Sequence, residues 1–201
     1  LWHPMGHPGE ARENAPRIIK GAEGVEIIDI DGHTTVDAVG GLWCVNLGYS
    51  NDRIKEAISG QLYDLPYYSA FAGSTNPAAI EAAYAVQELF APDGMARVFF
   101  TSGGSDSVET CLRLARQYHR LRGEPTRTKF LSLKKGYHGT HWGGASVNGN
   151  NRFRITYEPL LPGCFHLPSP YTYRNPFDET DPAKLAEKIA AAMVDEIEFQ
   201  D

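Results

Sequence analysis

The segment 99–123, FFTSGGSDSVETCLRLARQYHRLRG, joins a short apolar run to a helix-like pattern through two glycines. At such a corner the first backbone N–H groups of the helix lack helical partners, and the helix dipole adds roughly half a positive charge. Gly103 and Gly104 let the backbone approach a bulky anion closely. Further hydroxyl donors are available on Thr101, Ser102 and Ser105. The corner therefore predicts a phosphate site, with an ordinary helix cap shaped by glycines as the alternative.

Several better-defined motifs are absent from this corner. The chain has no GxxxxGK[ST], which excludes a P-loop, and no GxGxxG between a strand and a helix. The nucleophile elbow GxSxG fails because the residue two positions after Ser105 is Ser107 rather than glycine. HExxH is also absent. These absences argue against the common nucleotide-binding, serine hydrolase and metalloprotease sites.

A second polar loop, KKGYHGTHWGGAS, follows the next predicted strand and contains Tyr137 and His138. An exposed aromatic at a strand end is suited to stacking on a flat ring, although packing is the more common use of a loop aromatic. His138 and His141 are three apart, without an accompanying set of carboxylate or cysteine ligands. We therefore expect no metal site.

Local patterns predict the elements that position these loops. Asp31-Gly32 indicates a hairpin over 25–39. Helices are expected after the caps Asn51 and Asn76, after the glycine corner, and after Asp181. Short strands are expected at 96–101 and 128–133, whereas 149–180 reads as surface turns. The strand–loop–helix succession predicts an α/β unit with a mostly parallel sheet, whose ligands lie at the carboxyl ends of strands.

Bulk composition limits the partners that we expect. The 201 residues carry a formal net charge of −6, which disfavours nucleic acid and anionic membranes as partners. No apolar run approaches the roughly 18 residues that a membrane span needs. Cys44, Cys111 and Cys164 lie far apart and form no CxxC pair. Composition therefore predicts a cytoplasmic protein with buried free thiols.

TSGGSDSVETCLRLAR followed by KKGYHGTHWGGAS resembles the class III (omega) aminotransferases, which are pyridoxal-phosphate enzymes of fold type I. GLWCVNLGYSN and PYYSAFAGSTNPAAIEAA are similar to upstream segments of that family, with amine:pyruvate and omega-amino-acid transaminases the most similar. The resemblance implies the α/β PLP-transferase fold, with an incomplete, mostly parallel sheet and flanking helices. Residues 1–50 would be part of a small N-terminal α+β domain, and 51–201 the first part of the large cofactor-binding domain.

The same resemblance implies which residues bind the cofactor. The phosphate of pyridoxal phosphate falls on Gly104 and Ser105, while Gly103 stands where the family usually has a serine. Tyr137 corresponds to the tyrosine that stacks on the pyridine ring, and His138 lies beside it.

Four further residues are expected to line the substrate pocket. They are Trp43, Tyr68, Phe71 and Met5. For each aromatic among them, core packing is the alternative.

The resemblance also implies an amine donor, a keto-acid acceptor such as pyruvate, and a homodimer with a shared active site. The lysine that carries the cofactor is expected beyond residue 201, so no catalytic residue is assigned and the chain alone is expected to be inactive. The alternatives are another fold type I enzyme, such as an aminomutase or decarboxylase, and a non-catalytic module that binds a phosphorylated ligand.

Overall fold

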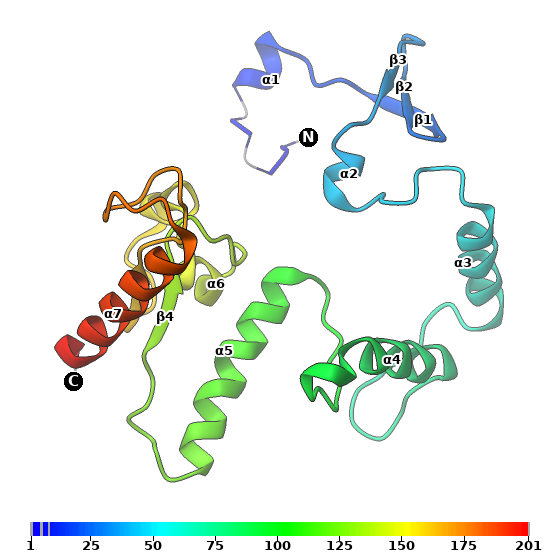
Figure 1. Cartoon of the computed structure of the whole chain (residues 1–201). Helices are drawn as coiled ribbons and strands as arrows, with labels where there is room; N and C mark the ends of the chain where they lie inside the picture. The colour runs from blue at the N-terminus through cyan, green and yellow to red at the C-terminus, as the bar shows by residue number, and fades with distance from the viewer. Residues whose placement is uncertain (1, 5, 8, 201) are drawn as a thin grey trace. The chain divides into compact units, whose positions relative to one another are not determined.

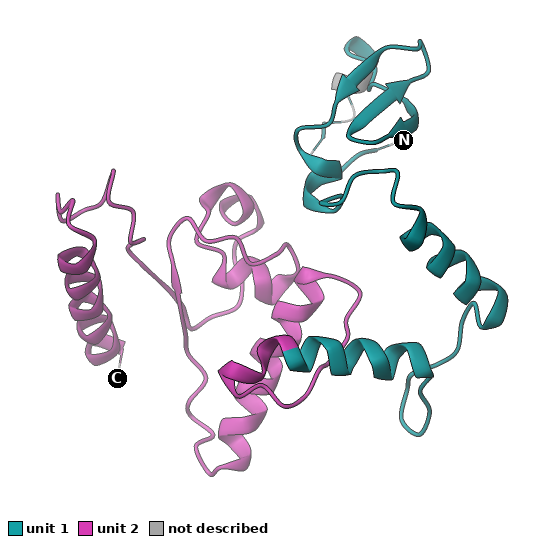
Figure 2. Ribbon diagram, turned by 45° about the vertical axis from the view of Figure 1, so that its right-hand side comes forward, with its two compact units in different colours: residues 1–88 teal, residues 89–201 magenta. Residues whose placement is uncertain are grey.

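The computed structural model describes residues 2–4, 6, 7 and 9–200, which form two compact units (Figure 2). Unit 1 spans residues 1–88 and unit 2 spans residues 89–201. The division falls inside helix α4, Pro77–Phe90. A domain boundary at residues 50–51 stays a prediction.

Unit 1 contains the predicted hairpin, extended by a strand that the sequence pattern did not indicate. Strands β1 (Ile19–Glu23), β2 (Glu26–Asp29) and β3 (Thr34–Val36) form an antiparallel sheet in that order. Gly32 adopts a φ of +88° between β2 and β3, a left-handed conformation that favours glycine. The hairpin predicted around Asp31-Gly32 is therefore confirmed.

The predicted helix caps of unit 1 are confirmed. The Asn51 side chain accepts from the Ile54 amide at the start of α3, Asp52–Asp64. The Asn76 side chain accepts from the Ala79 amide at the start of α4. Two short elements, α1 (Glu10–Glu13) and α2 (Gly40–Trp43), complete this unit.

Unit 2 holds a two-stranded parallel sheet with helices beside it (Figure 1). Its elements are α5 (Gly104–Leu121), β4 (Phe130–Leu133), α6 (Trp142–Val147), β5 (Cys164–Leu167), α7 (Pro182–Gln200) and the 3-10 turns η1 (Ala91–Asp93), η2 (Asn151–Phe153) and η3 (Ile155–Tyr157). Strands β4 and β5 pair in parallel from Phe130–Cys164 to Leu133–Leu167. The buried apolar side chains are Ala145, Val147, Leu167, Leu185 and Ile189. They come from α6, β5 and α7, which is where the core of this unit lies. The expectation of buried thiols is wrong for Cys44 and Cys111, which are exposed, while Cys164 is partly buried.

The strand expected at 96–101 does not form. Residues 95–100 have no strand partner within the described part of the chain, and the Phe99 side chain is 72% exposed. A strand exists only as part of a hydrogen-bonded ladder, so an apolar run without a partner stays irregular. None of the helices formed by the described residues combines the length and apolar character that a membrane crossing requires.

Candidate functional site

At the glycine corner, where helix α5 begins, two side-chain hydroxyls form hydrogen bonds to the backbone. The Gly103 carbonyl accepts from the Thr101 hydroxyl at 3.1 Å and from the Ser107 hydroxyl at 3.1 Å. The two hydroxyl oxygens lie 2.6 Å apart. Thr101, expected from the sequence to face a ligand, therefore fixes the corner instead, and Ser107 is a structural partner that the sequence did not reveal.

The same corner leaves room for an anion. A Cβ added at Gly103 or Gly104 would meet no atom within 4 Å. The N-cap residue of α5 is Gly103, which has no side chain to accept from the first N–H groups of the helix. Open space beside the first N–H groups of an 18-residue helix fits a phosphate group.

The loop after β4 lies directly on this corner. The Thr140 amide donates to the Ser105 hydroxyl at 3.1 Å, which leaves the serine's own proton available to a ligand. Gly139 has a φ of +98°, and a Cβ there would lie 2.6 Å from the Ser105 hydroxyl oxygen. Next to it, His141 Nδ1 lies 3.2 Å from a carboxylate oxygen of Asp106. The structure therefore brings the two polar loops together.

A carboxylate on α5 also binds the start of α6, the helix that follows this loop. Glu109 Oε2 accepts from the Gly143 amide at 2.9 Å and from the Gly144 amide at 3.2 Å. These amides belong to the first turn of α6, where a negative charge is favoured. The buried Asn148 side chain also donates to the Gly139 carbonyl at 2.9 Å. The sequence analysis missed Glu109. Nothing in its neighbourhood marks it, because the Gly-Gly pair that it binds lies more than 30 residues later in the chain.

Tyr137 lies on this loop with its ring accessible. Its side chain is 57% exposed and meets the Phe153 ring edge to face, with centroids 5.0 Å apart. His138 is half-buried beside it. A ring supported at one edge and open elsewhere is suited to stacking on a planar ligand. Gly103, Gly104, Ser105, Tyr137 and His138 all belong to unit 2.

The predicted substrate-pocket residues belong to unit 1. Trp43, Tyr68 and Phe71 are exposed, and among the described side chains none of these rings contacts another. Met5 lies outside the described residues. A shared pocket for these four stays a prediction.

Trp43 ends a turn of unusual backbone geometry. Gly40, Gly41, Leu42 and Trp43 have φ values of +59°, +59°, +62° and +68°, so α2 is left-handed. Left-handed backbone disfavours residues with a Cβ. Persistent strain of this kind is concentrated at functional positions.

Asp37 is the hydrogen-bond acceptor for this turn. Its carboxylate accepts from the Tyr49 hydroxyl at 2.5 Å, the Gly41 amide at 2.7 Å and the Val39 amide at 3.2 Å. These bonds, that from Tyr49 first, lower the pKa of Asp37. The hydrogen bond to Asp37 raises the pKa of Tyr49.

Asp29 organises the hairpin of unit 1. Burial by itself would raise its pKa, but hydrogen bonds from Arg17 and His33 outweigh burial and lower it to about 2. Asp29, Asp31 and His33 place potential ligand atoms within 4.8 Å of one another. Because Asp29 is already paired with Arg17, we assign no metal to this cluster.

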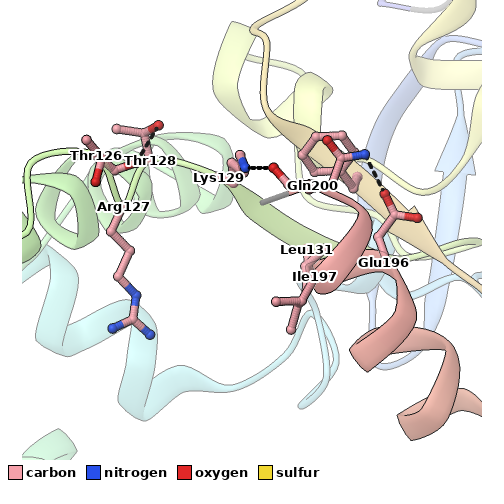
Figure 3. Close-up of a pocket in the computed structure, with 9 residues that line it drawn as sticks. Thr126, Arg127, Thr128, Lys129, Leu131, Glu196, Ile197 and Gln200 are labelled. Carbon is pink, nitrogen blue, oxygen red and sulfur yellow. Dashed lines mark hydrogen bonds between the residues drawn. The ribbon is translucent and has the colours of Figure 1, made fainter.

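Unit 2 also contains a pocket of about 440 Å³ between the segment before β4 and the end of α7 (Figure 3). It is lined by Thr126–Lys129, Leu131, Phe165, Glu196, Ile197 and Gln200. The Lys129 ammonium group donates to the Gln200 carbonyl across it. The pocket lies at the amino ends of both strands, whereas α/β sheets bind ligands at the carboxyl ends, so we do not assign it to the chemistry.

Known proteins resemble this chain in sequence and in fold. The sequence model of the class III aminotransferases matches residues 9–198. The chain is 37% identical to a putrescine–pyruvate aminotransferase of Pseudomonas aeruginosa over 164 residues, which cover 82% of this chain and 36% of that protein. It is 37% identical to an omega-aminotransferase of Caulobacter vibrioides over 168 residues, or 84% of this chain and 38% of that protein.

Solved structures give the same picture. An amine transaminase from an uncultivated Pseudomonas species, in its pyridoxal-phosphate-bound form, matches with a TM-score of 0.94 and 44% identity. That match covers 100% of this chain and 45% of the other. The predicted fold class is thereby confirmed, and the chain spans less than half the length of each of these relatives.

Proposed function

Because the chain belongs to the class III aminotransferase family, we propose that the polypeptide containing it is a pyridoxal-phosphate-dependent transaminase. Its reaction would move an amino group from an amine or omega-amino acid to a keto acid such as pyruvate. The observation that carries the proposal is the bond from the Thr140 amide to the Ser105 hydroxyl. It joins a helix start suited to phosphate to the loop that bears an exposed tyrosine ring.

Each cofactor residue has a defined part in this proposal. Gly103 and Gly104 leave the amides at the start of α5 accessible to the phosphate, and the Ser105 hydroxyl adds one donor. Tyr137 stacks on the pyridine ring, with Phe153 behind its edge. His138 lies beside this ring. When bound, pyridoxal phosphate supplies the electron sink for amino-group transfer.

The unit 1 aromatics form the second part of the proposal. Trp43, Tyr68 and Phe71, together with Met5, would border the amine and favour apolar or ring substituents. We assign no lysine of this chain to proton transfer. We further propose that the enzyme is a cytoplasmic homodimer with a shared active site.

The test uses the full-length polypeptide purified with pyridoxal phosphate. We expect alanine to form from pyruvate when an aryl amine or putrescine is supplied. Carbon dioxide release without alanine would favour a decarboxylase, an isomerised amine would favour an aminomutase, and cofactor binding without turnover would favour a non-catalytic module.

Cofactor absorption tests the assigned residues directly. Ser105→Ala combined with Tyr137→Ala should abolish the absorption band of bound cofactor. Tyr63→Ala, which removes a 91% exposed tyrosine on α3, serves as the control and should retain it. Full retention in the double variant would exclude this corner as the cofactor site.

A further inference from the structure

The left-handed turn at Gly40–Trp43 requires external support. Gly40 and Gly41 adopt this conformation readily, but Leu42 and Trp43 carry a Cβ that disfavours it. Leu42 and Trp43 are nevertheless 66% and 77% exposed. Burial of these side chains therefore does not compensate for the strain, so the stabilising interactions come from the surrounding backbone and polar groups.

Asp37 supplies that support through three hydrogen bonds. One comes from the Gly41 amide inside the turn, one from the amide of Val39 just before it, and the third from the Tyr49 hydroxyl on the segment that follows the turn. One carboxylate therefore links the residues that precede the turn to those that follow it. A carboxylate that accepts several N–H and O–H donors makes stronger bonds than a neutral acceptor.

The segment on each side of the turn is hydrogen-bonded to the connection between β1 and β2. The Asp37 amide donates to the Val25 carbonyl at 2.8 Å, and the Tyr49 amide donates to the Gly24 carbonyl at 2.7 Å. These two backbone bonds fix the positions of Asp37 and Tyr49 relative to Gly24 and Val25. Inside the turn, a Cβ at Gly41 would lie 2.7 Å from Val45, so the turn has little room to rearrange.

We propose that Asp37 is a positioning residue that, with Tyr49, holds the left-handed turn and so sets the direction in which Trp43 is presented to the amine substrate. The proposal rests on the proposed function, in which Trp43 borders the amine. It adds that discrimination between amines depends on a carboxylate that does not itself touch the substrate.

The experiment uses the full-length enzyme loaded with pyridoxal phosphate and labelled with 5-fluorotryptophan. The fluorine resonance of Trp43 is assigned by its loss in Trp43→Phe. Asp37→Ala should shift or broaden this resonance, and Asp37→Asn, which keeps one acceptor oxygen, should do so less. Tyr49→Phe should have an intermediate effect because it removes one donor. Asp31→Asn, a change at an exposed hairpin carboxylate, should leave the resonance unchanged.

Kinetics separate positioning from general damage. In Asp37→Ala, KM for an aryl amine should rise about tenfold, the scale of one lost apolar contact. For isopropylamine, KM and kcat should stay within twofold of the parent. If Asp37→Ala fails to fold, as judged by circular dichroism and cofactor content, Tyr49→Phe and Asp37→Asn provide the same comparison.

The outcomes distinguish the inference from its premise. An unmoved Trp43 resonance in folded Asp37 and Tyr49 variants would overturn the inference. So would equal losses for both amines. A Trp43→Ala variant with unchanged amine discrimination would refute the proposed role of Trp43 itself. Changed discrimination in Trp43→Ala, reproduced by the Asp37 variants, supports both.

Discussion

The Ser105 hydroxyl accepts a 3.1 Å hydrogen bond from the Thr140 amide, 35 residues later in the chain. This single bond joins the start of α5 to the loop that carries Tyr137. Gly139 packs against the same serine, because a Cβ at this position would overlap it. The helix start and the aromatic loop therefore share one contact surface, and a change on either side is expected to disturb the other.

Gly139→Ala tests this contact. The new Cβ would lie 2.6 Å from the Ser105 hydroxyl oxygen at a φ of +98°, so the loop must move away from α5. We expect affinity for pyridoxal phosphate to fall at least tenfold, or about 1.4 kcal/mol, measured by absorbance titration of the full-length enzyme. Gly123→Ala is a matched control, because its φ is +84° but no atom lies within 4 Å. Equal effects of the two changes would contradict the prediction.

Glu109→Ala tests how α6 is held. The change leaves the amides of Gly143 and Gly144, both buried residues, without their acceptor. An unsatisfied buried donor costs about 1–3 kcal/mol. We expect hydrogen exchange of the α6 amides to report a local opening free energy lowered by about that amount. Glu109→Gln should be milder because it keeps an acceptor oxygen, and Glu187→Ala on α7 should leave α6 protection unchanged.

Asp29 gives the hairpin a defined response to acid. Its pKa falls from about 3.8 to about 2 on folding, so its contribution to stability is present above pH 4 and disappears as the pH falls through 2. We expect Asp29→Asn to speed amide exchange in 19–36 at neutral pH. The difference from the parent should shrink between pH 4 and pH 2. A difference that persists unchanged at pH 2 would mean that the carboxylate charge is not the cause.

Leu185 tests the core of unit 2. Its side chain is fully buried in α7. Leu185→Ala should lower the free energy of unfolding by about 2–5 kcal/mol, the cost of a cavity at such a site, measured by urea denaturation. Met193→Ala, at a partly exposed position of the same helix, should cost clearly less. Equal costs would place the core elsewhere.

Local signals in the sequence predict much of this fold. Asp31-Gly32 marks the hairpin, and the Asn51 and Asn76 caps mark two helix starts, because these signals act over a few residues. The order and spacing of the glycine corner and the Tyr137 loop indicate the family.

Long-range pairing explains what the sequence pattern missed. Strand β5 has only four residues in a segment rich in turn formers, and it becomes a strand only by pairing with β4. Helix α6 has a glycine pair of low helix propensity in its first turn, and these two amides donate to Glu109 from another element. Conversely, the apolar run before Thr101 has strand-like composition but pairs with no strand in the part of the chain that the structure describes. Pairing between distant segments leaves no local trace.

The left-handed turn also bears on how the enzyme could be redesigned. At position 43 the backbone already has a conformation that glycine adopts without penalty, and the indole buries little surface. Replacing Trp43 with glycine would therefore remove bulk while relieving strain. Under the proposal that Trp43 borders the amine, position 43 is therefore one where side-chain volume can be removed at little cost to the fold.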